Sequence, residues 1–233
     1  MKRVLIVSTS TIHGSDYLEY ILPEVKKFFG ENKKIVFIPY ARPGGISHDD
    51  YTELAAKKFK TIGIEVIGIH TSTNKEQLID DADGIFTGGG NTFLLVKQLH
   101  ELGLMKLIKT KVSEGKAYMG TSAGCNITGQ NMKTTNDMPI VLPPSFETLG
   151  LVPFNLNPHY LDPDPNSKHK GETRETRIKE FHTQNNTPVV GLREGSWLEV
   201  NNEEVILHGK LKAIVFEAKK APYELETGSL IKF

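Results

Sequence analysis

Short runs of apolar residues recur along this chain and alternate with segments in which the apolar residues have helical spacing. Most of the early runs are continuously apolar, which is typical of strands that are buried on both faces. This alternation predicts an α/β fold, a doubly wound and mostly parallel sheet with helices on both faces. The expected strands are Val4–Val7, Ile35–Ile38, Val66–Ile69, Gly84–Thr87, Ala117–Gly120, Val189–Leu192, Val205–His208 and Ala213–Phe216.

The segments between these runs carry the end signals of helices. Tyr17–Phe29 has apolar residues one helical turn apart and stops before Gly30, and Asp49 or Asp50 is placed to cap the next helix. Further helices are expected over Tyr51–Thr61, Lys75–Asp80, Phe93–Leu102, Leu104–Ser113 and about Gly171–His182.

The second half of the chain departs from this pattern. Seven prolines lie between Pro139 and Asn166, so this stretch is expected to be mostly loop, and a loop of that length usually serves a function. After the last helix, strands over Trp197–Val200 and Val205–Leu207 flank a turn at Asn201-Asn202. They predict a C-terminal antiparallel addition to the sheet.

Composition narrows the class of protein. The 233 residues contain 38% hydrophobic residues and no evident linker, so one domain over residues 1–233 is expected. Lys and Arg (28) balance Asp and Glu (28), which argues against a nucleic-acid partner. The single cysteine rules out an internal disulfide framework and fits a reducing cytoplasm. The plainly apolar runs are far shorter than the roughly 20 residues that span a bilayer, so no membrane partner is expected.

The sharpest chemical signal is Gly120-Thr121-Ser122-Ala123-Gly124, which follows an expected strand. This is the G-x-S-x-G pattern of a nucleophile elbow, in which a tight turn exposes the serine hydroxyl above the carboxyl end of a sheet. Ser122 is the candidate nucleophile, and the amide of Ala123 is a candidate oxyanion donor. A small-residue turn without chemistry is the alternative.

A glycine loop, Gly88-Gly89-Gly90, lies between the strand Gly84–Thr87 and the following helix. Bare backbone N–H groups near a helix N-terminus favour an anion, so the amides of Gly89 and Gly90 are candidate oxyanion donors. The loop lacks the spacing of a dinucleotide or P-loop motif. The alternative is a tight turn in which Asn91 or Thr92 caps the helix.

A serine nucleophile needs a base and a carboxylate that orients the base. Among eight histidines, His159 is the candidate base, because it lies downstream of the serine, just past the proline-rich loop, and Pro158 before it restricts the backbone. Two carboxylates remain open as its partner. Asp137 would give the chain order Ser–Asp–His, and Glu194 follows the strand Val189–Leu192.

Three further observations concern the chemistry. Cys125, one helical turn past the elbow serine, is interpreted as a small buried residue rather than the nucleophile. Arg174 and Arg177 share one helix face and could clamp a carboxylate, although a solvated charged face is the alternative. No pair of histidines has metal-ligand spacing, so no metal is expected.

Together these motifs resemble the aspartyl dipeptidase (peptidase E) family of serine peptidases over nearly the whole chain. The segments that carry the resemblance are Gly88–Thr92, Gly120–Gly124, Asn157–Tyr160, Gly171–Arg174 and Gly191–Gly195. It implies a flavodoxin-like, class I glutamine amidotransferase-like fold and a cytoplasmic enzyme without cofactor. It also implies hydrolysis of small dipeptides with an N-terminal aspartate, with Ser122 as nucleophile and His159 as base.

The resemblance leaves Asp137 and Glu194 open as the third member of the triad. Arg174, helped by Arg177, would then bind the aspartate side chain. Two other functions are weighed: a cyanophycinase-like peptidase that cuts an aspartyl–arginine polymer, and a catalytically silent ligand-binding module on the same fold. The sequence leaves monomer and homodimer equally open.

Overall fold

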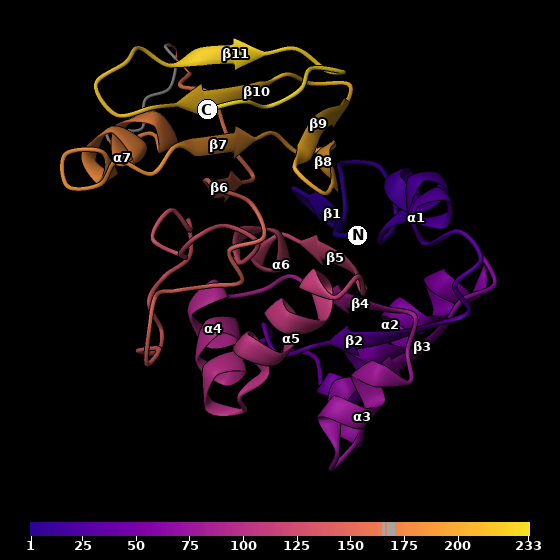
Figure 1. Cartoon of the computed structure of the whole chain (residues 1–233). Helices are drawn as coiled ribbons and strands as arrows, with labels where there is room; N and C mark the ends of the chain where they lie inside the picture. Colours follow the sequence, from indigo (N-terminus) through magenta and orange to yellow (C-terminus); the bar gives the residue numbers. More distant parts are fainter. Residues whose placement is uncertain (165, 167–170) are drawn as a thin grey trace.

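Two β-sheets organise the chain, where the sequence predicts one sheet with an addition (Figure 1). The computed structural model describes residues 1–164, 166 and 171–233, so Pro165 of the expected loop lies outside the described residues. The strands are β1 Arg3–Val7, β2 Lys34–Ile38, β3 Glu65–Gly68, β4 Gly84–Thr87, β5 Ala117–Thr121, β6 Asn155–Pro158, β7 Val189–Leu192, β8 Ser196–Asn201, β9 Glu204–Gly209, β10 Ala213–Phe216 and β11 Tyr223–Leu225.

The larger sheet has seven strands in the order β3-β2-β4-β5-β1-β8-β9. Its first five members pair in parallel, and the hairpin β8–β9 adds antiparallel to β1. The predicted α/β class with a mostly parallel sheet and an antiparallel C-terminal addition is therefore confirmed. β1, β2, β4 and β5 are buried almost throughout, as their continuous apolar sequences predict.

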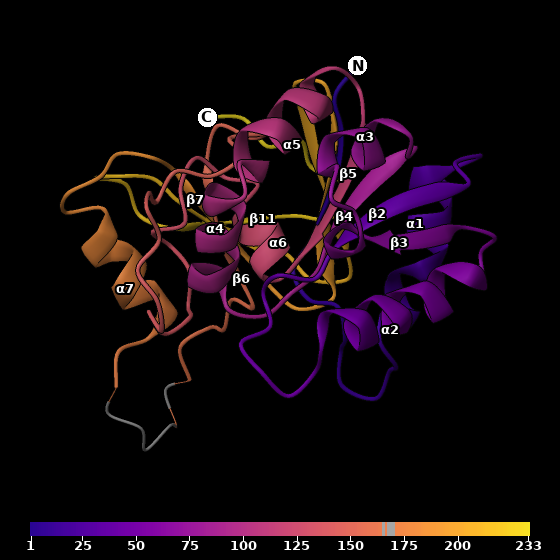
Figure 2. The ribbon, with the colours of Figure 1, turned by 90° about the horizontal axis from the view of Figure 1, so that it is seen from below.

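Helices cover both faces of this sheet (Figure 2). On one face α1 and α2 pack on Leu5, Phe37 and Phe86, and on the other α3, α4 and α5 pack on Ile6, Val36 and Ile85. The helices are η1 Glu19–Ile21, α1 Leu22–Phe29, α2 His48–Lys60, η2 Ile69–Thr71, α3 Lys75–Asp80, α4 Thr92–Glu101, α5 Leu104–Ser113, α6 Ala123–Asn126 and α7 Arg174–Phe181.

Two helix starts differ from the sequence-based expectation. The α-helix expected from Tyr17 begins only at Leu22, because Leu18 has a left-handed backbone (φ 57°) and Pro23 stands in the first turn, where a missing N–H is tolerated. α2 is capped by Ser47, whose hydroxyl accepts a hydrogen bond from the N–H of Asp50, and not by Asp49 or Asp50.

The smaller sheet has four strands in the order β11-β10-β7-β6. β6 lies within the stretch that the prolines predicted as mostly loop. It is an edge strand, where Pro158 is tolerated because one edge has no ladder partner. β6 and β7 run parallel, with Pro158 opposite Leu192, so both end at the same edge. α7 packs Ile178 on this sheet through Val189 and Phe216.

The two sheets therefore present two sets of strand ends. In the larger sheet, Ser8 directly follows β1, the glycine loop starts at Gly88 after β4, and Ser122 directly follows β5. β6 and β7 lead into His159 and Glu194. The candidate site lies where these two sets of ends meet.

Candidate active site

Ser122 occupies a strained turn between β5 and α6, with φ 54° and ψ −110°. A non-glycine residue in this region of the backbone is uncommon, and such strain is typical of functional positions. Two close approaches explain the glycines around it. A Cβ on Gly120 would lie 2.1 Å from the carbonyl oxygen of Gly124, and a Cβ on Gly124 would lie 2.3 Å from that of Thr87. The G-x-S-x-G pattern thus forms the predicted elbow.

The imidazole of His159 is within hydrogen-bond distance of Ser122. Its Nε2 lies 2.9 Å from Ser122 Oγ, and its Nδ1 lies 2.7 Å from Oε1 of Glu194. A neutral imidazole with its proton on Nδ1 satisfies both contacts, because Ser122 then donates to Nε2 and Nδ1 donates to the carboxylate. His159 also has a positive φ of 54°, so both residues of the Ser122–His159 contact have strained backbone.

Of the two carboxylates that the sequence left open, Glu194 is the one that contacts His159. Asp137 lies at the N-terminus of α4, where Thr92 donates to its Oδ2 from the backbone N–H at 2.7 Å and from the hydroxyl at 2.6 Å. The first turn of a helix has unpaired N–H groups and a positive end, so a carboxylate is stabilised there. The expectation of Asp137 as the partner of His159 is not met, because its oxygen is bound to this helix end.

The glycine loop lies against the elbow. A Cβ on Gly89 would stand 2.9 Å from Ser122 Cβ, so only glycine fits this approach. The N–H of Gly89, however, donates to the hydroxyl of Tyr51 at 2.9 Å. This overturns the expectation that Gly89 is an oxyanion donor. The N–H groups of Gly90 and Ala123 bond to no residue within the described part of the chain.

Tyr51, which no sequence motif singles out, reaches the glycine loop from α2. Its hydroxyl both accepts from the Gly89 N–H and donates to the Gly89 carbonyl at 3.2 Å. Its ring is fully buried against Phe37. Nothing in the sequence around Tyr51 indicates this contact, because Tyr51 and Gly89 are 38 residues apart.

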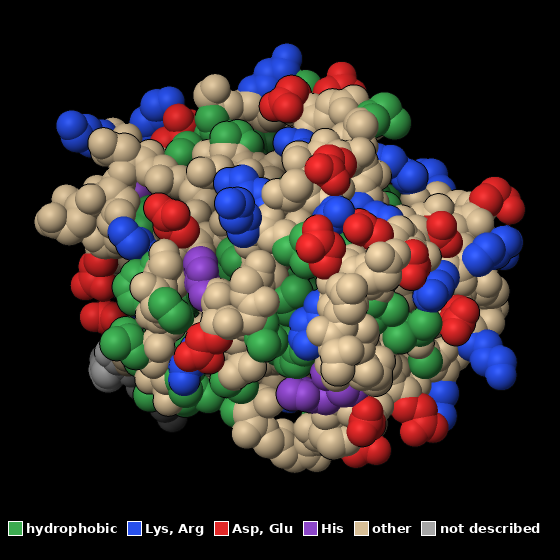
Figure 3. Space-filling model, turned by 60° about the horizontal axis from the view of Figure 1, so that its bottom comes forward, with side chains coloured by type: hydrophobic (Ala, Val, Ile, Leu, Met, Phe, Trp, Pro, Cys, Tyr) green, Lys and Arg blue, Asp and Glu red, His purple; other side chains and the backbone are tan. Residues whose placement is uncertain are grey.

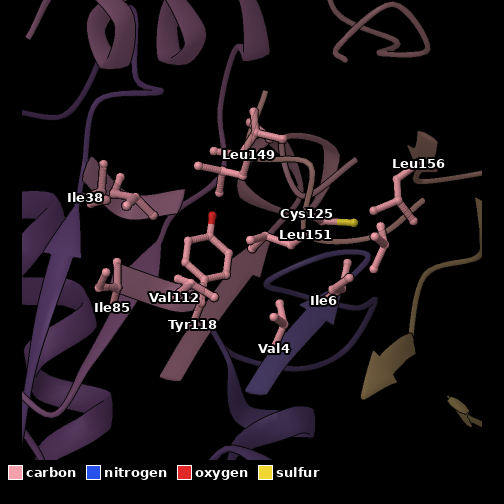
Figure 4. Close-up of a cluster of buried hydrophobic side chains, with 14 of the residues drawn as sticks. Val4, Ile6, Ile38, Ile85, Val112, Tyr118, Cys125, Leu149, Leu151 and Leu156 are labelled. Carbon is pink, nitrogen blue, oxygen red and sulfur yellow. The ribbon is translucent and has the colours of Figure 1, made fainter. Parts of the chain in front are cut away.

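Cys125 is fully buried beside the elbow, in the apolar cluster with Ile6, Leu151 and Leu156 (Figure 4). Burial raises the pKa of its thiol far above the usual range, because the charged thiolate is disfavoured in this apolar setting. The expectation that Cys125 is a buried side chain is confirmed.

Arg174 and Arg177 lie in the first turns of α7, which Thr173 caps through its hydroxyl. Both line a hollow of about 410 Å³ whose other wall is Leu161–Asp164, the segment that follows His159. Arg177 Nε lies 3.7 Å from Glu172 Oε2, whereas Arg174 has no carboxylate partner among the described residues. Burial and the nearby Arg177 lower the pKa of Arg174, and the charge of Asp137 opposes them. Arg174 is thus a half-buried cation near Asp137.

The described residues hold no group of three or more His, Cys, Asp or Glu side chains arranged to bind a metal ion. None of their helices is both long enough and apolar enough to cross a bilayer. Figure 3 shows acidic and basic side chains interspersed over one face of the molecule.

Comparison with known proteins identifies the family of the chain. The model of peptidase family S51 matches residues 4–208. A Streptomyces coelicolor protein named "Peptidase E" is 48% identical over 227 residues, which cover 97% of this chain and 92% of that protein. A Drosophila melanogaster protein named "Probable alpha-aspartyl dipeptidase" is 43% identical over 227 residues, covering 96% of this chain and 93% of that protein.

The fold recurs in a solved structure. The crystal structure of a peptidase from an acI-B1 Actinobacterium aligns with all of this chain and 97% of its own, with a TM-score of 0.75 at 17% identity. An α/β fold that hydrogen-bonds an elbow serine to a histidine, and that histidine to a glutamate, has the geometry of a serine hydrolase. The family match narrows this class to a serine peptidase. The chain belongs to peptidase family S51.

Proposed function

We propose that this chain is a dipeptidase that hydrolyses dipeptides with an N-terminal aspartate through an acyl-enzyme. The observation that carries the proposal is the line of hydrogen bonds from Ser122 through His159 to Glu194. The names of the relatives from Streptomyces coelicolor and Drosophila melanogaster support the dipeptide and aspartyl parts of it.

In the proposed reaction, Ser122 Oγ attacks the peptide carbonyl while His159 Nε2 takes its proton. Glu194 accepts the Nδ1–H bond and stabilises the imidazolium that forms. The amides of Gly90 and Ala123 hold the oxyanion, since neither has a partner within the described residues. His159 then protonates the leaving amine, and water resolves the acyl-enzyme by the same route.

Arg174 supplies the specificity for aspartate. It lines the hollow next to the His159 segment and has no carboxylate partner among the described residues, so a substrate carboxylate would fill that role. A guanidinium holds a carboxylate bidentately, which fixes side-chain length as well as charge. Arg177 acts as a helper, since Glu172 already lies beside it.

The proposal extends to the setting of the enzyme. Residues 1–233 act as one catalytic domain in the cytoplasm, with neither metal nor cofactor and with a small peptide as the partner rather than nucleic acid or membrane. The balanced charge and the single cysteine support this setting. A chelator is accordingly expected to leave the activity unchanged.

The test is a panel of X-Leu dipeptides with every residue at X, an aspartyl–arginine polymer, and the variant Ser122→Ala. We expect cleavage of Asp-Leu, little or none of Glu-Leu and Asn-Leu, none of the polymer, and no activity in the variant. Cleavage of the polymer but not of Asp-Leu would replace the proposal with the cyanophycinase-like function. Binding of Asp-Leu without turnover would support the silent module.

A further inference from the structure

The residues of the candidate triad come from different sheets, and side chains rather than a strand ladder join those sheets at the site. β6 is the edge strand of the smaller sheet, so one of its edges lacks a strand partner. The carbonyl of Leu156 on that edge accepts from Asn126 Nδ2 and from Thr134 Oγ1, each at 2.8 Å. The carbonyl of Pro158 accepts from Asn136 Nδ2 at 2.7 Å.

At His159, the residue that follows β6, the partner is Ser8. It directly follows β1, the strand beside β5, and it is fully buried. Its Oγ accepts a hydrogen bond from the backbone N–H of His159 at 3.0 Å and donates one to the carbonyl of Leu192 at 2.7 Å. One hydroxyl thus ties the larger sheet to the ends of both β6 and β7.

These two contacts lie next to the proposed catalytic groups. Leu192 is the last residue of β7 and stands two residues before Glu194. Ser8 is the partner of the His159 N–H, whereas the N–H of the next residue, Tyr160, donates to the carbonyl of Leu192. Ser122 is anchored on the same side, since its N–H donates to the carbonyl of Val7, the neighbour of Ser8.

We infer that Ser8 is a positioning residue that sets where the His159–Glu194 pair lies relative to Ser122. The inference rests on the proposed function in its choice of nucleophile and base. The imidazole and the carboxylate are 33% and 47% exposed, so the hydrogen bond between them contributes little to holding the strand ends in place. The buried hydroxyl of Ser8 instead holds the backbone N–H of His159 and the carbonyl of Leu192, two residues before Glu194. The reaction rate is sensitive to small displacements of the reacting atoms, since a misplacement of about 1 Å can lower it about 100-fold.

The experiment compares Ser8→Ala, Ser8→Cys and Ser8→Thr with Thr148→Val. Thr148 is the matched control, because its buried hydroxyl also donates to a backbone carbonyl, that of Gly129 at 2.7 Å, and no triad residue is involved. Three quantities are measured on the full chain: the rate at which a fluorophosphonate labels Ser122, kcat and KM for Asp-Leu, and the melting temperature.

We expect Ser8→Ala and Ser8→Cys to label Ser122 about 10- to 100-fold more slowly and to lower kcat by a similar factor, with KM changed less than about twofold. Ser8→Thr, which keeps a hydroxyl, should retain most of the labelling rate. Thr148→Val should lower the melting temperature and keep the wild-type rate. A thiol is a weak hydrogen-bonding group of similar shape, so Ser8→Cys carries the test if the alanine variant does not fold.

The inference is overturned if a folded Ser8→Ala or Ser8→Cys variant labels at the wild-type rate, or if Thr148→Val slows labelling as much. Failure of the wild-type enzyme to cleave Asp-Leu would refute the proposed substrate alone, because the labelling rate does not depend on that substrate. Absence of labelling in the wild-type protein would overturn both.

Discussion

The Nδ1 atom of His159 lies 2.7 Å from Oε1 of Glu194, and the two residues follow neighbouring parallel strands, β6 and β7, that end in register. Parallel pairing is what brings them together, since residues just past the carboxyl ends of adjacent parallel strands share one edge. Asp137, by contrast, serves the N-terminus of α4.

The two carboxylates should therefore respond differently to loss of charge. Glu194→Gln is expected to lower kcat by up to about 10⁴, because an amide can donate to Nδ1 and stabilise the wrong tautomer of His159. Asp137→Asn should keep kcat within about tenfold and destabilise the protein by about 1 kcal/mol through the weakened end of α4. Steady-state kinetics and denaturant unfolding measure the two effects. Near-wild-type kcat in both variants would indicate a serine–histidine dyad.

Substitutions of Ser122 and Cys125 should have different effects, because Ser122 is the proposed nucleophile and Cys125 is a buried side chain. Ser122→Ala is expected to reduce kcat by about 10⁶, as loss of a triad serine does, whereas Cys125→Ser should keep measurable activity. Because Cys125 is fully buried and burial raises the pKa of its thiol, iodoacetamide should modify the protein only once denaturant unfolds it. Mass spectrometry of the labelled peptide checks this, and rapid labelling of the native protein would contradict it.

Arg174→Met should lower kcat/KM for Asp-Leu by about 30-fold or more, which corresponds to at least about 2 kcal/mol for a charge pair that loses one partner. Arg177→Met is the control and should cost less, because Glu172 already shares its charge. Both variants are also assayed on any neutral X-Leu dipeptide that the wild-type enzyme cleaves. Equal losses on aspartyl and neutral substrates would assign Arg174 to the structure of α7 instead.

Tyr51→Phe tests the support beneath the glycine loop. It removes the hydroxyl that accepts from the Gly89 N–H and leaves that buried donor unpaired, so we expect a loss of about 1–3 kcal/mol in the free energy of unfolding. Tyr160→Phe is the matched control, since the buried Tyr160 hydroxyl has no partner among the described residues. A smaller loss in Tyr51→Phe than in the control would contradict the contact.

The parts of this protein that follow from local sequence were predictable, and those that depend on long-range contacts were not. The continuous apolar runs identified the central strands, and the G-x-S-x-G pattern identified the elbow at Ser122, because each is a property of adjacent residues. The strand Asn155–Pro158 was missed, because its polar and proline residues are stabilised by side chains from elsewhere in the chain.

The same distinction applies within the site. The sequence left Asp137 and Glu194 open, since the choice depends on β7 pairing in parallel with β6, a register that no local pattern encodes. It assigned Gly89 to the oxyanion because it could not show that Tyr51 reaches the loop from α2. Residue type and spacing identified the candidate residues. Only the three-dimensional contacts distinguished their roles.

The polar bonds along the open edge of β6 make activity a more sensitive reporter of this protein's integrity than its helix content. Each such bond contributes about 1 kcal/mol, far less than the burial of the apolar faces of the larger sheet. Because Leu156 and Leu192 belong to the same apolar cluster as Ile6, mild denaturant would weaken the polar bonds before the sheets separate. Hydrolysis would then stop while circular dichroism still reported folded helices. Storage conditions and stabilising substitutions for this peptidase should therefore be chosen by how well they preserve the placement of His159 and Glu194 relative to Ser122.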